Sequence, residues 1–378
     1  MSSLLNCKFL WIMLIILGLI TKLTLFSTKT GDYIGYLEPW MNFIKTHGNE
    51  QSLKFGFYDY TPSYIYILIA IVKLGLNPLF SVKLVSVFFE YVLAFLIGKI
   101  ATLKYKSNIV IWISLAIIPI LPSILLNSSY LSQSDAIYSA FVVGSVYFLL
   151  IRKQLLTVLF LGFAFAFKMQ SAIILPFYFV MMLRGNIKWY YFSIVPIIYL
   201  LSILPTWFYG RPMNELLTIY LSQSGSYKYL TLNFPNLYIW ISNVYYEPAK
   251  IVGIISTALL TLASGFWLSN KNFNFTIEIW VKLAFLSAII VPFVLPGMHE
   301  RYMYLGDVLG VLYFLFNRKN IHLPIGILLV SLYSYIRCSR YNEILPLWPA
   351  FFIYLAVIIL TAIDFVSTLK KSSNEIAK

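Results

Sequence analysis

Long apolar runs alternate with short polar connections along almost the entire chain. The longest of these runs cover residues 9–26, 85–98, 109–126, 136–151 and 348–363. A helix of about 20 apolar residues is long enough to cross a hydrocarbon core of about 30 Å. The pattern therefore predicts an all-α, polytopic integral membrane protein with about 12 transmembrane helices and juxtamembrane helices in its outer loops.

The boundaries of the apolar runs and the basic residues beside them place the expected helices. The expected spans lie near residues 9–26, 80–99, 108–126, 135–151, 155–168, 170–183, 189–205, 250–268, 279–296, 303–317, 321–336 and 346–368. Residues 62–75 are too short to cross comfortably, so we expect a juxtamembrane or re-entrant helix there. The first run resembles a signal peptide, but no small-residue cleavage site follows it, which predicts a retained span.

Composition supports this fold class. Of the 378 residues, 60% are hydrophobic and only 11% are charged, and the mean hydropathy is +0.81. A soluble domain is usually about a quarter charged. The net charge of +14 would suggest nucleic acid in a soluble protein, but here most Lys and Arg residues flank spans and face lipid headgroups. We expect one membrane domain over residues 1–378, with membrane lipids and no nucleic acid as partners.

The short connections also predict an orientation, because cytoplasmic loops are enriched in Lys and Arg. The basic connections lie near residues 99–106, 152–153, 184–188, 270–271, 318–319 and 370–371. Placing them inside puts both termini in the cytoplasm of a multi-pass plasma-membrane protein. The two longest connections, about 27–61 and 206–249, then lie outside. Nine of the fourteen acids fall on that side, namely Asp32, Glu38, Glu50, Asp59, Asp135, Glu215, Glu247, Glu300 and Glu343, so the chemistry is expected to be extracytoplasmic.

The first polar cluster directly follows the first span. Asp32 and Glu38 lie there beside Trp40, an interfacial anchor. A carboxylate just outside the membrane suits a general base that takes a proton from a sugar hydroxyl. The alternative is a solvated loop acid beside a glycine turn.

Two further clusters lie at helix starts. Asp59 and Tyr60 precede Pro62, so Asp59 either contacts substrate or only favours the dipole of the following helix. Gln133 and Asp135 open a later span, where they either bind sugar hydroxyls or cap the helix. The sequence leaves both alternatives open.

The remaining clusters contain basic residues. Lys168 and Gln170 lie between two short apolar segments, and a lysine in the membrane costs roughly 2.5–3.5 kcal/mol, so it needs a partner such as a phosphate, or it snorkels. The run from His299 through Glu300 and Arg301 to Tyr302 combines a base, an acid and a guanidinium. Arginine suits bidentate phosphate recognition, whereas a Glu300–Arg301 ion pair is the structural alternative.

Two acids fall within expected spans. Glu90 is expected to pair with Lys83, seven residues earlier on the same helix, and Asp307 with Arg301 or with a neighbouring helix. Intramembrane acids are functional candidates by default, but we interpret both as structural.

In this order, the clusters resemble the GT-C glycosyltransferases, specifically bacterial relatives of GPI mannosyltransferase II. The resemblance covers about residues 10–320 and depends on Asp32, on Tyr60-Thr61-Pro62, on Gln133-Ser134-Asp135, on Lys168-Met169-Gln170 and on Met298 to Tyr302. It implies a GT-C-like fold and an inverting hexosyltransferase, for example a mannosyltransferase. The donor would be a polyprenyl-phosphate sugar, and the acceptor a glycan or a lipid-linked or cell-envelope molecule.

The resemblance also implies residue roles. Asp32 would be the catalytic base, and Lys168, His299 and Arg301 would bind the lipid phosphate. We expect Glu38, Asp59, Tyr60, Gln133, Asp135, Gln170, Glu300 and Tyr302 to contact substrate. No cofactor is expected to be required, and dependence on a divalent metal stays open.

Two other functions remain open at the level of sequence. A lipid-linked glycan polymerase would work on the same membrane face with the same carrier. A flippase or secondary transporter would also be polytopic with basic flanks. Transporters tend to show paired repeats and helices broken at the midplane, whereas the polar groups here gather at one face.

Overall fold

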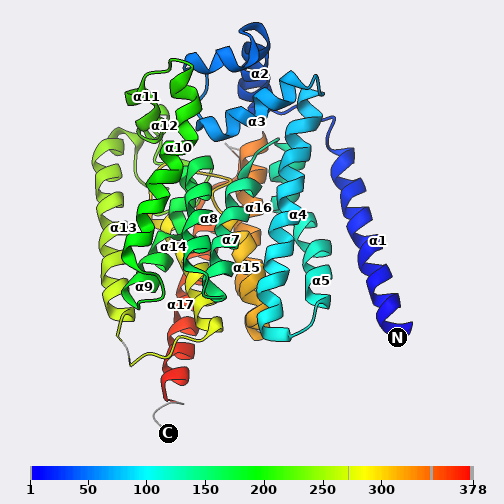
Figure 1. Cartoon of the computed structure of the whole chain (residues 1–378). Helices are drawn as coiled ribbons and strands as arrows, with labels where there is room; N and C mark the ends of the chain where they lie inside the picture. The colour runs from blue at the N-terminus through cyan, green and yellow to red at the C-terminus, as the bar shows by residue number, and fades with distance from the viewer. Residues whose placement is uncertain (1, 271, 341–343, 375–378) are drawn as a thin grey trace. The chain divides into compact units, whose positions relative to one another are not determined.

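The protein is built from helices. The computed structural model describes residues 2–270, 272–340 and 344–374 (Figure 1). Within these ranges, strand is confined to β1 (Thr231–Leu232) and β2 (Met298–His299), which pair in parallel. The predicted all-α class is therefore confirmed.

Several helices are long and apolar enough to cross a membrane. Among the described residues there are six, or seven if one bent pair counts as a single span. The six are Pro78–Tyr105, Trp189–Phe208, Asn243–Leu268, Ile277–Val294, Arg318–Ser339 and Trp348–Asn374. These helices are consistent with a membrane protein, as the hydrophobic pattern predicts.

The expected number of about 12 spans is not confirmed, because several expected spans form shorter helices. These are Asp135–Leu150, Gln154–Phe167, Met169–Leu183 and Tyr304–Phe316. At about 1.5 Å per residue, they fall short of a hydrocarbon core of about 30 Å. The segment expected to be juxtamembrane or re-entrant is also a short helix, Pro62–Lys73.

One expected span, 108–126, differs in shape from the prediction of a continuous helix. The chain forms Ile109–Ile120 and Pro122–Tyr130, bent by 59° at Leu121. Pro119 and Pro122 lie on either side of the bend. Proline lacks the N–H that would continue the helix and clashes with the preceding turn, so the break follows from the sequence.

The contacts of the chain divide into two compact units. The first contains residues 1–171 and 190–226, and the second contains residues 172–189 and 227–378. The α-helices of the first unit are α1 (Ser2–Thr24), α2 (Glu38–Thr46), α3 (Pro62–Lys73), α4 (Pro78–Tyr105), α5 (Ile109–Ile117), α6 (Pro122–Leu125), α7 (Asp135–Leu150), α8 (Gln154–Phe167), α10 (Ile194–Phe208), α11 (Met213–Leu217) and α12 (Ile219–Ser226).

The α-helices of the second unit are α9 (Leu175–Leu183), α13 (Tyr246–Leu268), α14 (Ile277–Val294), α15 (Tyr304–Phe316), α16 (His322–Arg340) and α17 (Trp348–Asn374). Short helical turns complete the chain. The 3₁₀ turns are Asn49–Lys54, Ile118–Ile120, Met169–Ile174, Trp189–Ser193, Asn243–Tyr245 and Arg318–Asn320, and the π-helical turns are Tyr33–Leu37 and Leu126–Tyr130.

In the first unit, α4 packs against α5 and α7, and α8 packs against α7 and α10. Glycines allow the close approach at two of these crossings. A Cβ at Gly98 would lie 2.6 Å from the Cα of Ile111, and one at Gly144 would lie 2.5 Å from the ring of Phe160. Small residues at helix crossings are the usual way in which membrane helices maximise packing.

The connection after α1 folds onto one end of the first unit. Figure 1 shows α2 and α3 at the end opposite the N-terminus of α1. Buried side chains from both helices, including Trp40, Ile44, Ile65 and Leu68, form one apolar cluster with Val82 of α4. This cluster fixes the backbone that carries Asp32, which directly precedes the π-helical turn Tyr33–Leu37.

Candidate functional site

Three predicted site residues meet at this end of the first unit. The Gln133 side-chain amide donates a hydrogen bond from Nε2 to Asp32 Oδ2 over 2.5 Å. The Tyr60 hydroxyl donates to Gln133 Oε1 over 3.2 Å. Asp32 is half-buried and Gln133 is buried. A neutral amide fixes the orientation of the carboxylate without cancelling its charge, which suits a proton acceptor.

A second set of contacts surrounds Lys168. Its Nζ lies 2.6 Å from Asp135 Oδ1, and both side chains are buried. Asn127 donates from Nδ2 to the other carboxylate oxygen of Asp135 over 2.8 Å. Lys168 Nζ also lies 5.1 Å from the centre of the Tyr60 ring. Tyr60 therefore connects the two sets of contacts. Together we call Asp32, Tyr60, Gln133, Asp135 and Lys168 the Asp32 cluster.

Local backbone structure explains how these residues are presented. Lys168 has extended backbone angles at the point where α8 ends. Its side chain therefore projects from a break between two helices. Ser132 has a φ of 61°, a left-handed conformation that is uncommon for a residue other than glycine. That turn directly precedes Gln133, and strained backbone of this kind is concentrated at functional sites.

Helix α4 holds both sides of the Asp32–Gln133 contact. Lys83 Nζ donates to the carbonyl oxygens of Leu25 and Thr28, over 2.9 and 2.7 Å, in the segment that leads to Asp32. Ser86, three residues further along α4, donates to the Gln133 carbonyl over 2.8 Å. Residues three apart share one face of a helix, so a single face of α4 positions both partners.

The expected pairing of Glu90 with Lys83 is wrong. Glu90 forms its ion pair with Lys22 of α1, with 2.6 Å between Nζ and Oε2, and both side chains are fully buried. Lys83 is occupied by the two carbonyl groups before Asp32. The physical reason is distance, since residues seven apart are separated by about two helical turns along the axis.

The other predicted residues of the first unit have different surroundings. Glu38 forms an ion pair with Lys29 over 2.6 Å. The side chain of Asp59 is exposed, and its backbone carbonyl accepts a hydrogen bond from Gln223. Gln170 is half-buried in the 3₁₀ turn that follows Lys168. A substrate contact of any of these three residues stays a prediction.

Tyr33 adjoins Asp32 and stays protonated. Burial, with a smaller contribution from the negative charge of Glu38, raises the pKa of Tyr33 to about 12. Its hydroxyl is therefore a neutral group around pH 7 and cannot compete with a carboxylate as the general base.

The four consecutive residues His299 to Tyr302 lie in the second unit. β2 holds His299 through its pairing with Leu232 of β1. The buried Glu300 carboxylate accepts a hydrogen bond from Arg301 Nη1 over 3.0 Å, and its other oxygen lies 3.9 Å from His299 Nδ1. The His299 ring contacts the ring of Tyr302, with 5.1 Å between centres. We call these four residues the His299 cluster.

The structure contains two contacts that the sequence left open. The ion pair between Glu300 and Arg301, which was the structural alternative for these residues, is present. Asp307 has a partner on a neighbouring helix, because Ser331 of α16 donates to its carboxylate over 2.7 Å. Neither contact excludes a role for Arg301 in binding an anion, since its guanidinium carries five donors.

Sequence reasoning missed three residues that support the Asp32 cluster, namely Lys83 as a backbone anchor, Ser86 and Asn127. The available signal was a polar residue inside an apolar segment, which usually has a specific partner. For metals, the described ranges 2–270, 272–340 and 344–374 contain no group of three or more His, Cys, Asp or Glu side chains placed to hold an ion.

Comparison with known proteins finds no similar protein. No protein-family model, no curated protein and no solved structure matches the chain significantly.

Proposed function

We propose that the chain is a membrane glycosyltransferase of about twelve spans that transfers a hexose from a polyprenyl-phosphate donor on the extracytoplasmic face. The observation that carries the proposal is the hydrogen bond from the Gln133 amide to Asp32, with Tyr60 in turn donating to Gln133. A neutral amide thus orients the Asp32 carboxylate, at the end of a unit whose helices suit a membrane. The order of motifs along the chain agrees with the GT-C resemblance.

The proposed step is a single displacement. Asp32 accepts the proton of an acceptor hydroxyl while the hydroxyl oxygen forms a bond to the anomeric carbon of the sugar. The bond from that carbon to the phosphate oxygen breaks, and polyprenyl phosphate leaves with the electron pair. Attack opposite the leaving group inverts the anomeric centre. The GT-C resemblance implies phosphate recognition by Lys168, His299 and Arg301; of these, Lys168 is already paired with Asp135, so we propose His299 and Arg301 as the main phosphate contacts.

The test uses purified protein in lipid vesicles with a set of polyprenyl-phosphate hexoses and a lipid-linked glycan acceptor. Asp32→Asn keeps the size of the side chain and removes the proton acceptor. A general base typically contributes about 10²–10⁴-fold to rate, so kcat should fall by that amount while donor binding survives. Glu38→Gln is the matched comparison and should retain kcat, with any effect confined to KM, because Glu38 is expected to contact substrate and not to accept the proton, and it pairs with Lys29.

The outcomes separate the competing functions. Release of polyprenyl phosphate with formation of one new glycosidic bond supports the proposal. Products that grow by many repeat units indicate a glycan polymerase. Movement of the intact donor across the vesicle membrane, without release of polyprenyl phosphate, indicates a flippase. Normal turnover by Asp32→Asn together with loss of turnover in Glu38→Gln would transfer the role of base to Glu38.

A further inference from the structure

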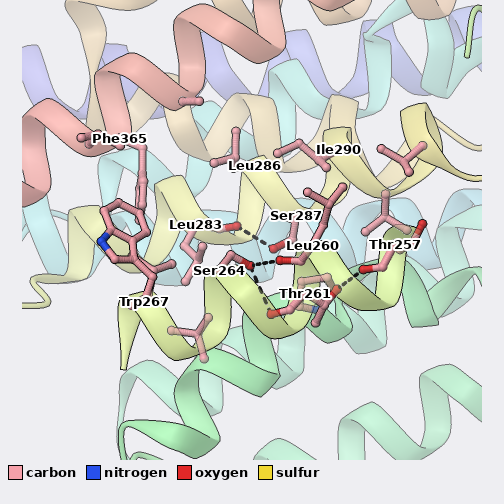
Figure 2. Close-up of a pocket in the computed structure, with 17 residues that line it drawn as sticks. Thr257, Leu260, Thr261, Ser264, Trp267, Leu283, Leu286, Ser287, Ile290 and Phe365 are labelled. Carbon is pink, nitrogen blue, oxygen red and sulfur yellow. Dashed lines mark hydrogen bonds between the residues drawn. The ribbon is translucent and has the colours of Figure 1, made fainter. Parts of the chain in front are cut away.

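A partly open cavity lies in the second unit, between α9, α13, α14 and α17, and its lining residues Leu260 and Trp267 are half exposed. Figure 2 shows its lining side chains, and its volume is about 200 Å³. Apolar side chains line most of it, among them Pro176, Leu260, Leu286, Ile290 and Phe365. None of the lining residues carries a charge, so a phosphate or other ionic headgroup has no partner there.

The few hydroxyl groups of the lining bond to their own helices. Each donates to a carbonyl oxygen one turn earlier: Thr257 to Gly253 over 2.8 Å, Thr261 to Thr257 over 2.8 Å, Ser264 to Leu260 over 2.6 Å and Ser287 to Leu283 over 2.9 Å. Hydroxyl donors used in this way are not available to a ligand. The hydroxyl groups of a sugar would find few hydrogen-bond partners in this cavity. A hydrocarbon needs none.

The way in which α13 packs explains why the cavity exists. A Cβ at Gly253 would lie 2.5 Å from Pro296 Cδ, and one at Gly265 would lie 2.4 Å from the ring of Phe179. These two glycines let α13 approach its neighbours closely at two points. The α13 residues that line the cavity begin after Gly253, at Thr257, and continue past Gly265 to Leu268, so most of the lining of α13 lies between the two close approaches.

Hydrocarbon is also the expected surroundings of these helices. The segment Asn243–Leu268, α14 and α17 are each long and apolar enough to cross a membrane. The side of α13 away from the cavity exposes large apolar residues such as Ile251, Ile255 and Leu259. Ligand sites for drug-sized molecules are usually about 300–1,000 Å³, so about 200 Å³ suits part of one chain rather than a whole lipid.

We infer that this cavity binds one acyl chain of a bilayer phospholipid, which fills the space between α13 and α14. The chain completes the van der Waals contacts that the two helices do not make with each other. Packing of this kind, rather than the hydrophobic effect, drives association inside a bilayer. A phospholipid is the proposed occupant because the lining is mostly apolar and uncharged, and because acyl chains are the hydrocarbon expected around the exposed apolar side of α13 in a membrane.

The inference is tested on full-length protein in vesicles that contain a phospholipid with a photoreactive diazirine on one acyl chain. After irradiation, adducts are mapped to residues by mass spectrometry. In the unmodified protein we expect adducts on lining residues of α13 and α14. Leu286→Trp fills the cavity and should reduce these adducts at least tenfold. Ile255→Trp adds the same bulk to an exposed position of α13 and should leave them unchanged.

Thermal unfolding supplies a second measurement. Added phospholipid should raise the Tm of the unmodified protein and of Ile255→Trp, but should raise that of Leu286→Trp less. Ser264→Leu, a smaller filling change, replaces Leu286→Trp if the latter does not fold. The inference is overturned if adducts in the unmodified protein fall only outside the lining residues, or if Leu286→Trp and Ile255→Trp lose adducts equally. Displacement of the probe by polyprenyl phosphate but not by phospholipid would also overturn it.

Discussion

Substitution of Lys83 tests how the fold holds Asp32. Lys83 is fully buried on α4, and it donates to the carbonyl groups of Leu25 and Thr28. Lys83→Met keeps the length and apolar body of the side chain and removes the charged donor. The segment that leads to Asp32 would then lose its tie to α4.

The magnitude depends on two opposing effects. A hydrogen bond that involves a charged group contributes about 1.5–3 kcal/mol, so loss of two such bonds would destabilise the protein. Burial of the ammonium group carries a desolvation cost of several kcal/mol, which the substitution removes. These effects are similar in size, so we expect the free energy of unfolding of Lys83→Met to stay close to that of the unmodified protein.

Activity should respond differently from stability. A displacement of about 1 Å in a reacting group can cost about 10²-fold in rate, and Lys83 holds a carbonyl only four residues before Asp32. We therefore expect kcat to fall roughly ten- to hundredfold with little change in KM for the donor. Ser86→Ala, which releases the Gln133 carbonyl, should lower kcat in the same direction.

The assay measures sugar transfer from a polyprenyl-phosphate hexose, beside the thermal unfolding of each variant. Lys73→Met is the matched control, because Lys73 is an exposed lysine that pairs with Glu50 at the surface, and such pairs contribute little. Lys83→Met with normal kcat would refute the idea that α4 positions Asp32. A variant that loses kcat and stability in equal measure would show that Lys83 only maintains the fold.

Three further predictions concern Arg301, the Lys22–Glu90 ion pair and the orientation of the chain in the membrane. Arg301→Ala should weaken binding of a polyprenyl-phosphate sugar roughly ten- to hundredfold, measured by titration, and unchanged affinity would remove Arg301 from phosphate recognition. Lys22→Met should destabilise the protein by about 3–5 kcal/mol because it leaves Glu90 buried and uncompensated, and Lys22→Met with Glu90→Leu should restore much of that loss in denaturant unfolding. Reporters fused after Gln133 and after Arg152 should lie outside and in the cytoplasm, respectively, and opposite locations would contradict the orientation.

Local signals in the sequence predicted individual helices well. The helix expected at 135–151 is observed at Asp135–Leu150, and the short helix expected at 62–75 is observed at Pro62–Lys73. Both begin at residues suited to a first turn. The bend within 108–126 was missed although Pro119 and Pro122 mark it, because hydrophobicity alone does not distinguish a continuous span from a broken one.

Contacts between distant segments could not be predicted in the same way. The pairing of Lys22 with Glu90 depends on how α1 lies against the rest of the unit, which no local pattern specifies. Asp32, Tyr60 and Gln133 were each selected from their positions beside expected spans. Their mutual contacts depend on the left-handed turn at Ser132 and on the anchors of α4, and neither feature has a signature in one sequence.

The ion pairs also bear on which basic residues are suited to the proposed recognition of the donor phosphate. The named members of the Asp32 cluster include two carboxylates and a single ammonium, and that ammonium belongs to Lys168, which is bound to Asp135. An excess of negative charge suits a proton acceptor and opposes a phosphate. The His299 cluster has one carboxylate, a guanidinium and an imidazole. On charge alone, recognition of a donor phosphate fits His299 and Arg301 better than Lys168, so Lys168→Met should affect kcat more than donor affinity.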